Sequence, residues 1–235
     1  MKIHHFIFHY GQDVKDSLEI QDKELVHQIS RVLNLSGGEK IILGNGQGEE
    51  LDCEIETVGK SVKVKILTRR EVEDSFSLTL YMAVVKRDNW EWVVQKAAEI
   101  GVTKIVPLIT EHTVKTNLNY ARLNKIVKEA TEQSGRAWLM KIENAISFKD
   151  SLENEAQGKS NYFLDQEGFG IEKLGKRREG EFSLWVGPEG GWSEKEKELA
   201  ELKGFKVLSL GSTTLRAETA AVVGAYLFSQ FEPHG

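Results

Sequence analysis

Two segments near the C-terminal end of the chain repeat one local pattern, and this pattern constrains the fold most. Each begins with a short apolar run, at 182–186 and at 205–210, and continues through glycine into a segment with helical character. The turns read GPEGG at 187–191 and LGSTTLRAETA at 210–220. Glycine lets the backbone approach a ligand closely, and a helix start presents free N–H groups. The pattern therefore predicts one ligand that is held by backbone groups between two strand ends.

The length and composition indicate a soluble protein with a substantial core. The chain has 235 residues, of which 40% are hydrophobic, so one large or two small domains are expected. No apolar run reaches the roughly 18 residues that a membrane span needs, and the N-terminus lacks a signal-peptide pattern. The single cysteine, Cys53, excludes an internal disulfide and is interpreted as a small buried hydrophobe. These features together predict a cytoplasmic protein without membrane contact.

The charge distribution neither requires nor excludes a nucleic-acid partner. The formal net charge of −5 argues mildly against one, but binding depends on local patches. The two basic patches, each more typical by itself of a solvated surface than of an RNA contact, consist of Lys63, Lys65, Arg69 and Arg70, and of Lys173, Lys176, Arg177 and Arg178. The histidines show no metal-ligand spacing, so no metal is expected.

The first 70 residues favour a small β-barrel domain. Short apolar runs lie between Gly and Asn turns, and residues 25–33 carry apolar side chains at helical spacing. The glycines at 44–48 are interpreted as a hairpin turn rather than a nucleotide loop, because no helical pattern follows them. The charged residues 68–74 form the expected linker.

From about residue 75 onward, apolar strand-like runs alternate with helical segments. This alternation predicts a parallel α/β sheet with helices on both faces, in a domain spanning 75–235. The expected helix signals are a cap at Asp88 or Asn89, a start at Asn117 or Asn119, and a Ser193–Glu196 capping box. Ligands bind such sheets outside the carboxyl ends of the strands, which is where both glycine turns fall. The first strand is followed by residues 86–89 without any glycine, so neither a Rossmann nor a Walker phosphate site is expected.

The last predicted helix, residues 218–231, has apolar side chains on nearly every face. A helix of this kind is buried. In a domain of modest size, we expect a second subunit to supply part of that burial.

The motif residues resemble the 16S ribosomal RNA (uracil-N3)-methyltransferase family of the SPOUT superfamily. The two C-terminal motifs carry the resemblance, together with QKAAEIGV at 95–102, EATEQSGR at 129–136 and HQISRVL at 27–33. The resemblance implies an N-terminal PUA-like RNA-binding domain, a C-terminal SPOUT domain with a deep trefoil knot, a homodimer, and small-subunit ribosomal RNA as partner. The knot is implied by the resemblance alone, because periodicity does not reveal one.

The resemblance also implies that S-adenosylmethionine binds in the knot. The residues expected at this cofactor are Leu164, Gly187, Glu189, Gly190, Leu210, Gly211, Leu215 and Thr219. Backbone groups there would read the adenine edge, and leucines would cover its faces. The chain departs from the family pattern at Thr213-Thr214, where an apolar pair is usual, and at Asn34, where an arginine is frequent. For the RNA, we expect Arg31 and Arg136 to contact phosphates.

The implied reaction has its own chemical demands. Uracil N3 carries a proton at neutral pH and must lose it in order to attack a sulfonium methyl. Histidine is the usual base, but the chain has none between His112 and His234. Arg216 is therefore expected to stabilise the uracil anion, and Glu218 to take the proton or to position Arg216. The structural alternative is that these two residues pair with each other near a helix start. Glu189 is another candidate acid, and Trp192 is either core or a contact to cofactor or base.

Two other interpretations compete with uracil-N3 methylation. One is a SPOUT methyltransferase of another RNA position or of a ribose oxygen. The other is a non-catalytic RNA-binding or ribosome-assembly protein that kept the fold. The intact pair of C-terminal motifs favours an enzyme, because a binding module does not need them.

Overall fold

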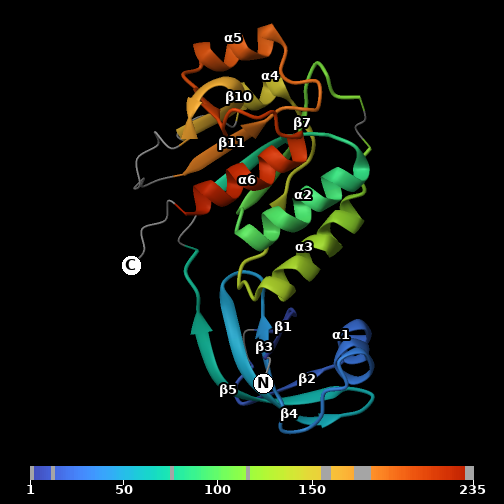
Figure 1. The fold of residues 1–235 in the computed structure, drawn as a ribbon. Coiled ribbons are helices and arrows are strands. Elements are labelled where there is room, and N and C mark those ends of the chain that lie inside the picture. The colour runs from blue at the N-terminus through green and yellow to red at the C-terminus, as the bar shows by residue number, and fades with distance from the viewer. Residues whose placement is uncertain are drawn as a thin grey trace. The chain divides into compact units, whose positions relative to one another are not determined.

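The computed structural model describes residues 3–11, 14–74, 77–114, 117–154, 160–171 and 181–230 (Figure 1). Contacts divide the chain into two compact units. The first contains Met1–Asp74 and Thr131–Leu139, and the second contains Ser75–Ala130 and Met140–Gly235. The expected domain bounds of 1–70 and 75–235 stay a prediction.

The first unit is built on one mainly antiparallel sheet. Its strands are β1 (His4–Ile7), β2 (Ser17–Ile20), β3 (Lys40–Gly44), β4 (Glu49–Val58) and β5 (Val62–Glu71). Their order is β1-β3-β4-β5-β2, with β1 parallel to β3 and the other neighbours antiparallel. The linker expected over 68–74 is wrong in part, because residues 68–71 belong to β5 and pair with β4. Alternate residues of these strands, such as Leu43 and Cys53, point into an apolar core. Cys53 is fully buried, which confirms its interpretation as a small buried hydrophobe, and this burial raises the pKa of its thiol to about 12.

The hairpin turn between β3 and β4 confirms the interpretation of its glycines. The Asn45 side chain accepts hydrogen bonds from the backbone N–H groups of Gln47 at 2.7 Å and Glu49 at 3.1 Å. Gly46 and Gly48 have φ values of 75° and 93°, which favour glycine. The single helix expected over 25–33 differs from the structure. A short α1 (Lys23–His27) continues into a π-helical turn η1 (Gln28–Val32), and the Asp22 carboxylate caps its start.

The second unit has a parallel sheet, as the sequence predicts. Its strands are β6 (Leu78–Ala83), β7 (Lys104–Ile109), β8 (Lys141–Ile142), β9 (Ile146–Ser147), β10 (Ser160–Gly170), β11 (Phe182–Val186) and β12 (Lys206–Ser209). They are ordered β12-β10-β11-β6-β7-β8, with β9 also on β7, and every pairing between described strands is parallel. The two-residue strands β8 and β9 were too short to show a period in the sequence.

Helices cover both faces of this sheet (Figure 1). They are α2 (Arg87–Ile100), α3 (Tyr120–Ser134), α4 (Phe148–Asn154), α5 (Glu194–Leu202) and α6 (Ala217–Ser229). Helix α6 lies against Leu184, which a side chain at Gly224 would meet at 2.8 Å. The next residue, Trp185, points to the other face and packs with Phe148 of α4. No described helix has both the length and the apolar character needed to cross a membrane.

The helix ends agree only in part with their sequence signals. Asn119 accepts from the Arg122 N–H at 3.1 Å, and the Ser193–Glu196 capping box is present, so both predictions are confirmed. The predicted cap at Asp88 or Asn89 is wrong, because α2 begins earlier, with Lys86 at the N-cap and no side-chain cap. The Asn89 amide donates instead to a carboxylate on another helix.

Candidate active site

The carboxyl ends of β11 and β12 lie beside Leu164 of the longer strand β10 at one edge of the parallel sheet. Leu164 of β10 pairs with Val186 of β11 on one side and with Leu208 of β12 on the other. The segments that follow these residues line a cavity of about 610 Å³. This volume suits a small-molecule ligand, and the carboxyl edge is where α/β sheets bind ligands.

Most of the residues expected at a cofactor lie in this one cavity. Seven of the eight line it, namely Leu164, Gly187, Glu189, Gly190, Leu210, Gly211 and Leu215. Thr219 is not among the lining residues and is half-buried in the first turn of α6. Two segments that are about 20 residues apart in the chain are therefore brought together by their parallel strands.

Glycine allows unusual backbone geometry at two positions around β12. A side chain at Gly168 would lie 2.5 Å from the carbonyl carbon of Leu208, so only glycine fits where the 160–170 segment passes β12. Gly211 has a φ of 131°, and its N–H and carbonyl both bond the Ser209 hydroxyl, at 3.3 Å and 3.1 Å. Gly211 thus places a peptide group, rather than a side chain, against the ligand space.

Trp192 forms an apolar wall of the cavity. Its indole N–H donates to the Leu164 carbonyl at 3.0 Å, and its ring stacks on Phe163 with centroids 4.3 Å apart. A side chain at Gly187 would meet this indole at 3.0–3.1 Å. The side chain expected to be either core or ligand contact thus has both environments, because it is buried and also lines the cavity.

The sequence analysis missed a charged group beside the same cavity. The Lys197 ammonium lies 3.5 Å from Asp165 and 3.4 Å from both Glu167 and Glu194. Burial lowers the Lys197 pKa, but the three carboxylates raise it more, so the net shift is upward. The neighbouring Gln166 amide donates to the hydroxyl of Thr214. Acidic residues directly after an apolar strand were the available signal for this group.

The starts of α2 and α6 carry cations with free side chains. Arg216 is the N-cap of α6 and lines the cavity, and Lys86 is the N-cap of α2. Neither side chain makes a hydrogen bond or ion pair with another residue that the structure describes. The positive end of a helix dipole disfavours a cation. Two such cations at helix starts therefore indicate a role other than helix stability.

Glu218 lies away from the cavity. Its side chain is buried, and its Oε1 accepts from the Asn89 amide of α2 at 3.1 Å. Its Oε2 has no hydrogen-bond partner among the described residues, and no ion pair with Arg216 is formed. The structure thus places this carboxylate between α2 and α6 rather than among the residues that line the cavity.

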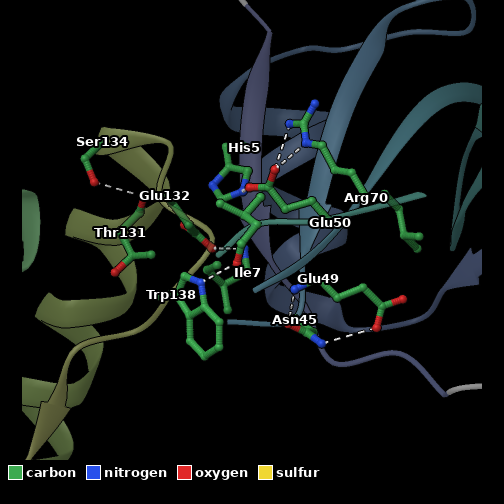
Figure 2. A network of polar contacts seen from close by, with 12 residues as sticks. His5, Ile7, Asn45, Glu49, Glu50, Arg70, Thr131, Glu132, Ser134 and Trp138 are labelled. Atoms are coloured by element: carbon green, nitrogen blue, oxygen red, sulfur yellow. Dashed lines mark hydrogen bonds and ion pairs between the residues drawn. The ribbon is translucent and has the colours of Figure 1, made fainter. Parts of the chain in front are cut away.

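The basic residues of the first unit differ in how far they are neutralised. Figure 2 shows Arg70 at the buried Glu50 carboxylate, with Nη2 and Oε2 2.7 Å apart, and His5 Nε2 at the other oxygen at 2.8 Å. Burial raises the Glu50 pKa, but these two hydrogen bonds lower it more. Arg69 pairs with Glu49 at 3.2 Å.

The two predicted RNA contacts fall in different surroundings. Arg31 is exposed on η1 and makes no hydrogen bond or ion pair with the described residues. Arg136 is half-buried in the 131–139 segment. This segment belongs to the first unit, where Glu132 accepts from the Ile7 N–H at 2.9 Å and Trp138 donates to the Val72 carbonyl at 2.7 Å (Figure 2). The second basic patch, Lys173–Arg178, lies outside the described residues.

Comparisons with known proteins agree with this architecture. The RNA methyltransferase domain family matches residues 72–229. Ribosomal RNA small subunit methyltransferase E from Rickettsia conorii is 36% identical over 211 residues, covering 87% of this chain and 86% of that protein. The protein of the same name from Synechocystis sp. is 31% identical over 84% of this chain and 68% of its own length.

Solved structures give the same result. Ribosomal RNA small subunit methyltransferase E from Neisseria gonorrhoeae, bound to S-adenosyl methionine, superposes with a TM-score of 0.86 at 26% identity and covers 95% of each chain. A probable rRNA-methyltransferase from Porphyromonas gingivalis gives a TM-score of 0.84 at 27% identity over 98% of each chain.

Proposed function

The chain belongs to the ribosomal RNA small subunit methyltransferase E family, and from this membership we propose that it methylates N3 of a uridine in 16S ribosomal RNA with S-adenosylmethionine. The cavity beside Leu164 of β10 and the ends of β11 and β12 is the observation that carries the proposal. It joins the two glycine motifs, and it is lined by Arg216, whose side chain has no partner among the described residues.

The residues of the cavity fit this cofactor. Peptide groups of 187–191 and 209–211 are available to adenine, and Leu164, Leu210 and Leu215 supply apolar surface for its faces. The bound cofactor supplies an electrophilic methyl group on a sulfonium. We expect micromolar binding, which corresponds to roughly −8 kcal/mol. Isothermal titration calorimetry with the cofactor and with its demethylated product tests this, and no heat with either would contradict it.

Arg216 is proposed to stabilise the negative charge that develops on the uracil ring. Its guanidinium has no competing partner among the described residues and lies at the cavity. A preorganised cation at a developing charge is among the strongest catalytic devices. Glu218 keeps the role of positioning residue in the proposal, because it ties the start of α6 to α2 through Asn89.

For the RNA, Arg31 and Arg136 remain the proposed phosphate contacts, the first from η1 and the second from the segment after α3. The partly neutralised patch at Arg69 and Arg70 is the less suitable surface, because carboxylates already occupy these side chains. The trefoil knot and a cytoplasmic location are part of the same proposal.

A homodimer is proposed from the exposed side of α6. Val223 and Tyr226 of the mainly apolar helix α6 are 36% and 54% exposed. Trp92 of α2, the helix that packs on α6, is 41% exposed. Because Val223 is accessible in a single chain, Val223→Asp should separate the subunits without unfolding them. Sedimentation equilibrium measures this, and a stable parent monomer at micromolar concentration would contradict the dimer.

Nucleoside mass spectrometry of ribosomal RNA tests the function itself. RNA from cells that lack the protein should lack 3-methyluridine in the small subunit, and the purified protein with cofactor should restore it. Gain of another methylated nucleoside would support a different SPOUT specificity. Binding of RNA without any methyl transfer would support the non-catalytic alternative.

A further inference from the structure

A tight turn after β7 lies against the glycine loop of the cavity. The turn consists of Thr110–Thr113, with the Thr113 N–H donating to the Thr110 carbonyl at 3.2 Å and the Thr110 N–H donating to the Thr113 hydroxyl at 2.9 Å. The Glu111 N–H donates to the buried Glu196 carboxylate of α5 at 3.0 Å. The turn is thus held both internally and from a second element.

His112 of this turn is not among the residues that line the cavity, but it touches two that are, Gly190 and Gly191. Its Nδ1 lies 3.0 Å from the Gly191 carbonyl oxygen, and a side chain at Gly190 would meet its Cβ at 3.3 Å. A carbonyl oxygen only accepts hydrogen bonds, so Nδ1 is the donor. In the neutral ring, Nε2 then carries the lone pair, and it has no hydrogen-bond partner among the described residues.

We propose that His112 is the general base that removes the uracil N3 proton. The inference rests on the proposed function and adds to it a histidine as general base, which the sequence analysis did not identify. In the step, the N3–H bond breaks and the proton passes to Nε2 of His112. The N3 electron pair forms the new N–CH₃ bond as the S–CH₃ bond breaks, and its electrons return to sulfur. The proton leaves the imidazolium to solvent after turnover.

The other ionisable groups near the turn and the glycine loop are less suitable as the general base. Both oxygens of Glu196 already accept backbone N–H groups, from Glu111 at 3.0 Å and Ser193 at 2.9 Å. Asp165 and Glu167 are paired with Lys197. Glu111, on the same turn, and Glu189, on the loop, are exposed carboxylates.

The variant His112→Asn distinguishes the role of His112 as a base from its hydrogen bond to the Gly191 carbonyl. The asparagine amide can still donate to the Gly191 carbonyl, but it cannot accept a proton. At saturating RNA and cofactor, we expect the single-turnover rate at neutral pH to fall about 100-fold with cofactor affinity unchanged. The rate of the parent should level off above the range where imidazole loses its proton, whereas the variant rate should keep rising with pH. His9→Asn, an exposed histidine of the first unit, is the matched control.

Chemical rescue distinguishes a base from a structural contact. Free imidazole should restore part of the rate to His112→Ala and leave the control variant unchanged. An unchanged rate in His112→Asn, or a slow variant with the parent pH profile and no rescue, would overturn the proposal. Those results leave uridine methylation by the parent intact. A parent that transfers no methyl group to N3 would instead remove the proposed function itself.

Discussion

In the first unit, Arg70 and His5 both face the Glu50 carboxylate, whereas in the second unit Lys86 and Arg216 face no acidic group among the described residues. The Glu50 carboxylate is 5% exposed and has both oxygens occupied. Its charge stabilises the contacts between neighbouring strands. Arg216 lies at the start of α6, where the helix dipole disfavours a cation, and it lines the cavity. Its charge is therefore available to a ligand. In this comparison, the charges that are fully paired with other side chains stabilise the fold, and the charge without a described partner lies where a ligand can bind.

Removing the charge of Arg216 should give the largest effect, a loss of turnover. Arg216→Ala should lower turnover by about 10²–10³ while folding and cofactor binding persist, because one charge-stabilising donor is lost and no described partner is left behind. Arg216→Lys should rescue only part of the rate, since lysine lacks the planar guanidinium. Single-turnover transfer of a labelled methyl group measures this, with the exposed Lys203→Ala as control. Arg216→Ala at the parent rate would remove this residue from the mechanism.

Breaking the closed network should affect stability and not chemistry. Glu50→Gln should cost about 1.5–3 kcal/mol of unfolding free energy, toward the lower end because Arg70 is 46% exposed. Because the folded-state pKa of Glu50 lies below its ordinary value, its stabilisation is present at neutral pH. It is lost as the pH falls below about 4.3, the ordinary glutamate value, and through the folded-state pKa. The variant and parent should therefore converge in acid.

Urea unfolding at several pH values measures this difference. Glu56→Gln, an exposed position on the same strand, should leave the curve unchanged. A constant difference between Glu50→Gln and the parent down to acid pH would show that the carboxylate charge is not what stabilises the network.

Crowding the glycine loop should weaken the cofactor site by a smaller amount. In Gly187→Ala, the new methyl group meets the Trp192 indole at 3.0–3.1 Å, and the indole must shift away from the Leu164 carbonyl. We expect cofactor affinity to fall about tenfold, or about 1.4 kcal/mol. Calorimetry tests this against Gly59→Ala, where the added carbon comes no closer than 3.9 Å to its neighbours. Equal affinities would mean that the loop and indole adjust freely.

The smallest effect is expected on the salt dependence of RNA binding, where Arg31, which has no partner among the described residues, is compared with Arg69, which is paired with a carboxylate. Arg31→Ala should lower the salt dependence of RNA binding by about one unit of log–log slope, because one phosphate contact is lost. Arg69→Ala should leave the slope unchanged, since its guanidinium already bonds Glu49 and the Val14 carbonyl. RNA binding measured at several salt concentrations tests both. The reverse pattern would move the RNA surface toward β5.

Local signals in the sequence predicted the elements well where a period or cap was present. β11 was expected at 182–186 and is found there, and the Ser193–Glu196 capping box and the closing Gly101 were also visible. The start of α2 was misread, because the side chain of Asn89 serves a contact to Glu218 that no local pattern reports. The two-residue strands β8 and β9 fall below the length at which alternation is visible.

By itself, the sequence determined the parallel α/β architecture, the β-rich first region and the two glycine motifs, because each depends on periodicity and backbone preferences within a few neighbouring residues. Only the tertiary structure decided which side chains share the cavity. Parallel strands carry Lys197, Asp165 and Arg216 to one edge of the sheet from distant points of the chain, and turn Glu218 toward α2. It also placed His112 at the loop of Gly191, across 79 residues of sequence. Such proximity is set by strand order and by the packing of turns, and no local sequence pattern encodes it.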